Sequence, residues 1–234
     1  MQLSTTGIGT FLTSLAWLFF YYRLSKNKSS SNDFVKYFKG FSLFFGLFFL
    51  VFSVPSMLFS DNSTLLGICY LIGHFLCFIG LAHLVRVSFL LIKPTSNSMG
   101  AFIAFLLAGV ATTILNIVYF NYPYVKDNVM QWGQAPQVGA AIGILSIIAF
   151  LPVAILFTRE AITQPKNRKR YGLIAAALFV TIICGPLHDV SSSAIVLMIA
   201  DALSIIACAM AFFGVVSIPK VDVVKVNKTV KSRP

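Results

Sequence analysis

Residues 38–59 read FKGFSLFFGLFFLVFSVPSMLF, and this stretch decides the class of fold. Its only charged side chain is Lys39, next to the first residue of the stretch. A helix of about 20 apolar residues is long enough to cross the ~30 Å hydrocarbon core of a lipid bilayer. We therefore predict that residues 38–59 form a transmembrane helix.

Other apolar windows of similar length end at clusters of charged and turn-forming residues. They cover residues 5–22, 65–89, 99–122, 138–157, 171–187 and 193–218. The composition agrees, because 58% of the 234 residues are hydrophobic and only 11% are charged, against roughly 25% charged residues in a typical soluble domain. We predict an all-α, polytopic membrane protein, with a seven-helix transmembrane domain at residues 1–218 and a short basic tail at residues 219–234.

The positions of the Lys and Arg residues predict the orientation, because cytoplasmic loops of membrane proteins are enriched in positive charge. Of the 18 Lys and Arg residues, all except Lys126 fall on one side of the predicted bundle. An odd number of spans places both the basic loop after the first helix and the basic tail on that side. We expect an integral multi-pass protein of the plasma membrane, with its N-terminus outside and its C-terminus in the cytoplasm.

The net charge of +11 also occurs in nucleic-acid-binding proteins. Here the basic residues lie between apolar spans rather than on one solvated surface, so we expect the lipid bilayer, and no nucleic acid, as a partner. The basic loops are suited to docking a cytoplasmic protein, and the candidate docking residues are Arg86, Arg168, Lys169 and Arg170. For Arg86 we also expect that its long side chain reaches the lipid headgroups or an interhelical water.

Asp201 is the acidic residue that lies well inside a predicted span. An ionised carboxylate at the centre of a bilayer costs roughly 2.5–3.5 kcal/mol on insertion scales, so the side chain should face the interior of the bundle. Ser204 and Cys208 follow at i+3 and i+7 and share the same helical face. A hydrogen bond that serves only helix packing is the alternative interpretation of Asp201.

The third span carries Tyr70, His74 and Cys77 at helical spacing. Because the third and seventh spans run in the same direction, His74 and Asp201 lie at similar depth and can form a pair, directly or through water. We therefore expect a small polar cavity between these two helices, centred on Asp201. The candidate residues for binding a ligand or a proton are Asp201, His74, Tyr70, Ser204 and Cys77. A neutral His74 that hydrogen-bonds a backbone carbonyl is the alternative interpretation.

Several classes of protein are excluded because this chain lacks residues that those proteins require. Retinal proteins need a lysine in the last helix, and none occurs between Lys169 and Lys220. Rhodopsin-like receptors carry an acid-Arg-aromatic triplet, whereas this chain has Val85-Arg86-Val87. The spans contain no paired acids, no Ser–His arrangement and no His-rich metal motif. We therefore expect no enzyme, no catalytic residues, no metal site and no cofactor.

Two functional hypotheses and one structural alternative remain. The first hypothesis is a receptor-like or sensory bundle that binds a small-molecule ligand in the polar cavity. The second is a small-solute or proton-coupled transporter that uses Asp201 as its protonation site, although the sequence shows no internal repeat. The alternative is a structural subunit of a membrane complex, in which the polar residues serve packing alone.

Overall fold

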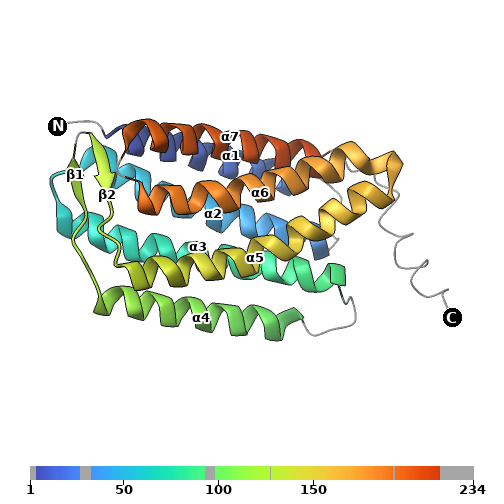
Figure 1. Ribbon diagram of the computed structural model, residues 1–234, viewed down its shortest axis with the longest axis horizontal. Coiled ribbons are helices and arrows are strands. Elements are labelled where there is room, and N and C mark those ends of the chain that lie inside the picture. The colour runs from blue at the N-terminus through green and yellow to red at the C-terminus, as the bar shows by residue number, and fades with distance from the viewer. Residues whose placement is uncertain (1–3, 27–32, 93–97, 127, 192, 217–234) are drawn as a thin grey trace.

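Seven helices run along the long axis of the molecule in the computed structural model, which describes residues 4–26, 33–92, 98–126, 128–191 and 193–216 (Figure 1). They are α1 (Thr5–Lys26), α2 (Asp33–Leu58), α3 (Ser63–Ile92), α4 (Ser98–Val118), α5 (Pro136–Thr163), α6 (Arg168–Val190) and α7 (Ala194–Val216), with a 3₁₀ turn at Pro165–Asn167. The tail expected at residues 219–234 lies outside the described residues.

Six helices, α2 to α7, are long and apolar enough to cross a membrane. The predicted helical, multi-pass membrane architecture is therefore confirmed. The helix α1 is long but more polar, because Thr6, Thr10, Thr13 and Ser14 form much of its buried face. That α1 is a seventh span, and that the N-terminus is outside, stay predictions.

Most helices extend a few residues beyond the apolar windows, since polar residues continue a helix outside the hydrocarbon core. The described part of α7 stays within its predicted window, and α4 ends at Val118 rather than at Tyr122 as predicted. The segment after α4 instead forms an antiparallel hairpin of β1 (Tyr124–Lys126) and β2 (Val129–Gln131), which the sequence analysis missed. This hairpin attaches to the start of α1, where the Thr5 amide donates to the Asn128 carbonyl at 2.9 Å.

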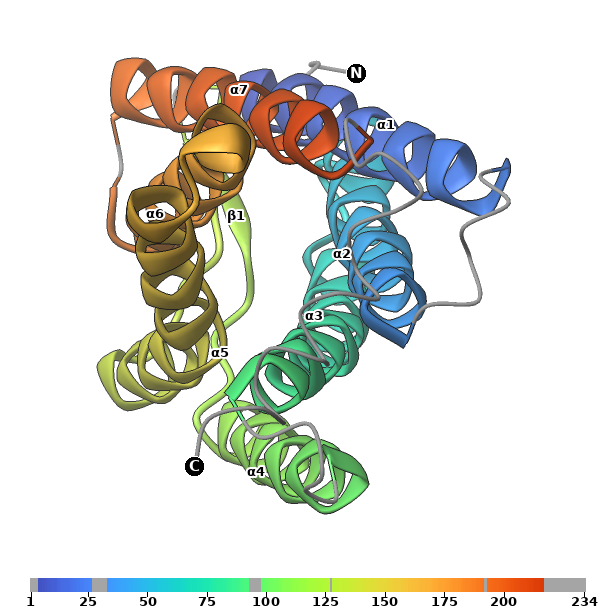
Figure 2. The ribbon, with the colours of Figure 1, turned by 90° about the vertical axis from the view of Figure 1, so that its right-hand side faces the viewer.

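Viewed along their axes, the helices form a ring (Figure 2). Each of α1, α2, α3, α5, α6 and α7 packs on the next, and α7 closes the ring against α1. Outside this ring, α4 packs on α3 and α5. The expectation that α3 and α7 are neighbours was wrong, because α1 and α2 lie between them on one side of the ring and α5 and α6 on the other.

Charge separates the two ends of the bundle. We call the end with the hairpin the hairpin end, and the end where α1 finishes and α2 begins the basic end. Among the described residues, Lys126 in β1 lies at the hairpin end (Figure 1). The other described basic side chains belong to segments at or near the basic end, namely Arg23, Lys26, Lys36, Lys39, Arg86, Arg159, Lys166, Arg168, Lys169 and Arg170.

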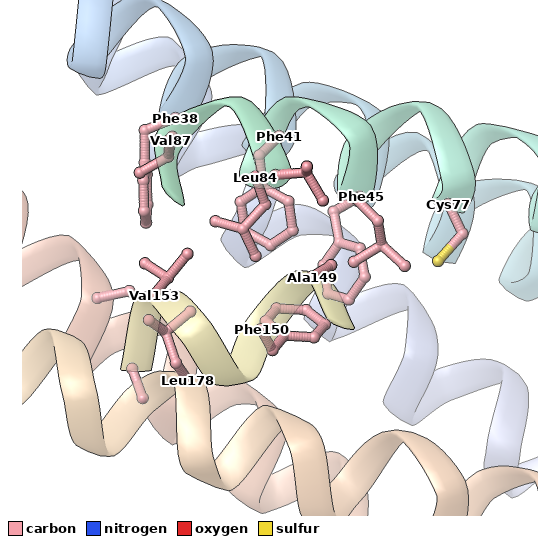
Figure 3. Close-up of a cluster of buried hydrophobic side chains, with 14 of the residues drawn as sticks. Phe38, Phe41, Phe45, Cys77, Leu84, Val87, Ala149, Phe150, Val153 and Leu178 are labelled. Carbon is pink, nitrogen blue, oxygen red and sulfur yellow. The ribbon is translucent and has the colours of Figure 1, made fainter. Parts of the chain in front are cut away.

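Phenylalanine rings fill the basic half of the ring of helices (Figure 3). Phe41 and Phe45 of α2 pack against Phe150 of α5, and Phe38 packs against Phe41. We call these four residues the aromatic plug. The ring centroids of Phe41 and Phe45 lie 4.9 Å apart, and those of Phe41 and Phe150 lie 5.8 Å apart. Each such aromatic pair adds about 0.5–1.5 kcal/mol beyond the burial of its surface. The plug closes the centre of the bundle toward the basic end.

Candidate functional site

A cavity of about 130 Å³ lies inside the ring, on the hairpin side of the aromatic plug. All six ring helices and the segment after β2 contribute to its wall, whereas no described residue of α4 does. Aromatic rings dominate this wall, with Trp17, Phe45, Phe48, Phe49, Phe52, Trp132 and Phe150. The polar and sulfur-containing side chains that line it are Thr10, His74, Cys77, Gln134, Ser146, Thr181 and Ser204.

Residues that follow the hairpin cover the cavity at the hairpin end. Trp132 packs its ring 5.3 Å from that of Tyr70 and 4.5 Å from that of Phe52, measured between centroids. The Gln134 side-chain amide donates a hydrogen bond to the Tyr70 hydroxyl at 2.7 Å. Tyr70 is only 1% exposed. We call Trp132 and Gln134 the cover of the cavity. Tyr70 packs against the cover and is not among the residues that line the cavity.

His74 lies in the α3 wall of the cavity, among the rings of Phe48, Phe52 and Tyr70. Its Nδ1 atom is 3.0 Å from the Tyr70 carbonyl oxygen. A carbonyl can only accept, so Nδ1 carries the proton in this bond. The backbone bond that we considered as the alternative interpretation is thus present, and His74 faces the cavity as well.

On α7, Asp201 and Cys208 are 5% and 2% exposed, so the face that they share with Ser204 points into the protein. Ser204 lines the cavity and lies near Cys184 on α6. Asp201 lies against Gly9 of α1, so closely that a β-carbon at Gly9 would overlap its carboxylate.

The direct pair of Asp201 and His74 does not form. The side-chain contacts of His74 are with α2 and α3, whereas Asp201 packs on α1. Asp201 is also not among the described residues that line the cavity, which is bordered by Ser204 one turn along α7. The cavity is therefore not centred on Asp201. The structure does bring His74, Cys77 and Ser204 to the same cavity, with His74 and Cys77 on α3 and Ser204 on α7.

The four candidate docking residues differ in their surroundings. Arg168 and Lys169 are exposed at the start of α6. Arg170 is half-buried and donates from Nε to the Gly214 carbonyl of α7 at 3.0 Å. Arg86 is also half-buried: it hydrogen-bonds the Tyr37 hydroxyl, and its guanidinium carbon lies 3.8 Å from the centre of that ring. Arg86 and Arg170 thus make contacts within the bundle, and the exposed pair is better placed to meet a partner.

Comparisons with known protein families and with characterised proteins find no match to this chain. In the described part of the chain, no three His, Cys, Asp or Glu side chains are grouped so that they could hold a metal ion. The cavity is therefore the feature from which a function can be argued. Its wall is apolar overall and rich in aromatic rings, with several polar side chains among them.

Proposed function

We propose that this chain is a receptor-like or sensory membrane protein, without catalytic activity, that binds a small molecule in the cavity. The observation that carries the proposal is the composition of the wall, to which all six ring helices contribute. A ligand there touches both sides of the ring at once. Its binding can therefore change how the helices pack, which is the requirement for a receptor.

The size and charge of the cavity limit the ligand. An engineered cavity of about 150 Å³ in another protein binds benzene, so about 130 Å³ suits a molecule of roughly one aromatic ring. No Lys, Arg, Asp or Glu is among the described residues of the wall. A charged ligand would lose its hydration without gaining a counter-ion. We infer an uncharged ligand of about the size of a single ring.

Closure at the basic end favours a receptor over a carrier. Phe38 and Phe41 of the aromatic plug are 0% exposed and lie between the cavity and the basic end. A carrier must open its binding site to both sides of the membrane, which here requires the whole plug to separate. The buried Asp201, one turn from the cavity, is the feature that would suit a proton-coupled carrier.

The helix α6 connects the cavity with a candidate output surface. Thr181, Gly185 and Pro186 lie in the cavity wall, and the same helix begins at the basic end with the exposed residues Arg168 and Lys169. We propose that a shift of α6 on ligand binding moves these basic residues. An acidic surface of a cytoplasmic protein would respond to that movement.

Filling the cavity tests this proposal. Gly143 of α5 lines the cavity, and a β-carbon placed there meets no atom within 4 Å. We expect Gly143→Leu to fold normally and to place its side chain where the ligand would lie. Binding of phenol to the purified protein, followed by saturation-transfer NMR, should fall at least tenfold in this variant.

Gly172→Leu is the matched control. Gly172 lies on α6, also has open space at its β-carbon, and does not line the cavity. This control should bind phenol as the wild type does. Phenol that partitions into the detergent contributes equally to both signals, so it does not affect the comparison. Equal phenol binding by wild type and Gly143→Leu would show that the cavity is not the binding site and would contradict the proposal.

A further inference from the structure

Two hydroxyl groups in the cavity wall direct their protons away from the cavity. The Thr10 hydroxyl donates to the Thr6 carbonyl at 2.7 Å, and the Thr181 hydroxyl donates to the Ala177 carbonyl at 2.9 Å. Each threonine has a single hydroxyl proton, and these bonds use it. What the two residues offer to a ligand is the pair of lone pairs on each oxygen.

His74 has the same bias, and Gln134 offers an acceptor as well as a donor. Since Nδ1 of His74 donates to the Tyr70 carbonyl, the neutral imidazole presents Nε2 as a hydrogen-bond acceptor. The Gln134 amide nitrogen donates to the Tyr70 hydroxyl. The Gln134 side-chain oxygen lies beside the α5 backbone at Gly139, another residue of the cavity wall. A helix wall and the cover therefore both offer lone pairs.

Three side chains of the wall can only accept a hydrogen bond from a ligand. Ser146, Ser204, Gln134, Trp17 and Trp132 can still provide a proton. Thr10, His74 and Thr181, on three different helices, can only accept one from a ligand. A ligand without a donor leaves these shielded acceptors unsatisfied, which weakens its binding. An anion would face their lone pairs and be repelled. A cation would find none of the described carboxylates in the wall.

We propose that the ligand is an uncharged, ring-sized compound that carries a hydrogen-bond donor, such as an aromatic hydroxyl or a ring N–H group. This inference rests on the proposed function, because it concerns the same cavity. The aromatic side chains hold the ring of the ligand. Its donor meets the acceptors of His74, Thr181 or Thr10, and the bond selects it over apolar rings of the same size.

Phenol and fluorobenzene test the proposal, since they have the same number of heavy atoms and only phenol has a donor. We expect the wild-type protein in detergent to bind phenol about tenfold more tightly than fluorobenzene, after correction for partitioning with Gly143→Leu. This preference for phenol should disappear in His74→Phe. It should become smaller in Thr181→Val, because valine has nearly the same shape as threonine but no hydroxyl. Binding of fluorobenzene and of phenol should both stay within twofold of wild type in the control Gly172→Leu, which lies outside the cavity.

The outcomes separate this inference from the proposed function. If both probes bind the wild type equally, and Gly143→Leu blocks both, the cavity binds ligands but the donor requirement is wrong. If the preference for phenol persists in each of His74→Phe, Thr181→Val and Thr10→Val, these acceptors do not make the selection and the inference is overturned. If Gly143→Leu blocks neither probe, the proposed function itself fails. Should His74→Phe not fold, His74→Leu takes its place in this comparison.

Discussion

Gly9 determines where the carboxylate of Asp201 lies. A methyl group at Gly9 would overlap this carboxylate, so we expect Gly9→Ala to push α1 and α7 apart. Overpacking of this kind costs about 1–3 kcal/mol. Thermal unfolding in detergent should show a lower midpoint for Gly9→Ala. The control Gly143→Ala, whose β-carbon meets open space, should be neutral or stabilised by up to about 1 kcal/mol.

A double-mutant cycle tests whether the overlap with Asp201 is the cause. In Asp201→Ala the obstructing carboxylate is gone, so adding Gly9→Ala to this variant should cost much less than adding it to the wild type. If the two substitutions are additive, Gly9 and Asp201 do not interact as described. In that case the position of Asp201 has another origin.

Single residues were partly predictable from the sequence. The cost of a carboxylate in lipid was enough to predict that Asp201 faces inward, and it is 5% exposed. The partner was not predictable, because helical spacing says which residues share a face but not which helix faces them. Gly9 was a usable signal, since small residues mark places where membrane helices approach closely.

At the scale of elements, the hairpin was the unpredicted feature. Its signal is short: two runs that contain β-branched residues, Tyr124–Lys126 and Val129–Gln131, lie on either side of a turn. Asn128 has a φ of 62°, which is the left-handed region that asparagine tolerates and β-branched residues avoid. The apolar window reached Tyr122 and obscured this signal, because tyrosine is common both at helix ends in membranes and in strands.

Asn128 therefore provides a test of the hairpin. We expect Asn128→Gly to keep the hairpin, and Asn128→Val to destabilise it by about 1–2 kcal/mol. The readout is hydrogen exchange at the Met130 amide, which donates to the Thr6 hydroxyl at 3.3 Å. Faster exchange at Met130 in Asn128→Val alone is the expected result. Equal exchange in both variants would mean that the turn does not hold the cover of the cavity in place.

At the scale of the whole molecule, composition and hydropathy predicted the helices but not their order around the ring. Lipid and the protein interior are similarly apolar, so periodicity does not show which face of a membrane helix meets lipid. For this reason α3 was expected beside α7, whereas α1 occupies that place. Six helices contribute to the cavity wall, so it could not be deduced from the polar residues of the third and seventh spans alone.

The position of the cavity follows from this order. The aromatic plug fills the ring at the basic end. Toward the hairpin end, the glycines Gly139, Gly143 and Gly185 leave space because they have no bulky side chain. Binding of a small molecule in that space is the central claim of the proposed function. It predicts one occupied position per chain, between the wall that contains His74 and the wall that contains Ser204.

The most direct measurement is anomalous diffraction from crystals of the protein soaked with 4-bromophenol, whose bromine marks the position of the ring. We predict a single strong bromine peak per chain inside the ring of helices, between His74 and Ser204 and on the hairpin side of Phe45 and Phe150. Bromine peaks only on the lipid-facing surface, with the cavity empty or filled by water, would contradict the account.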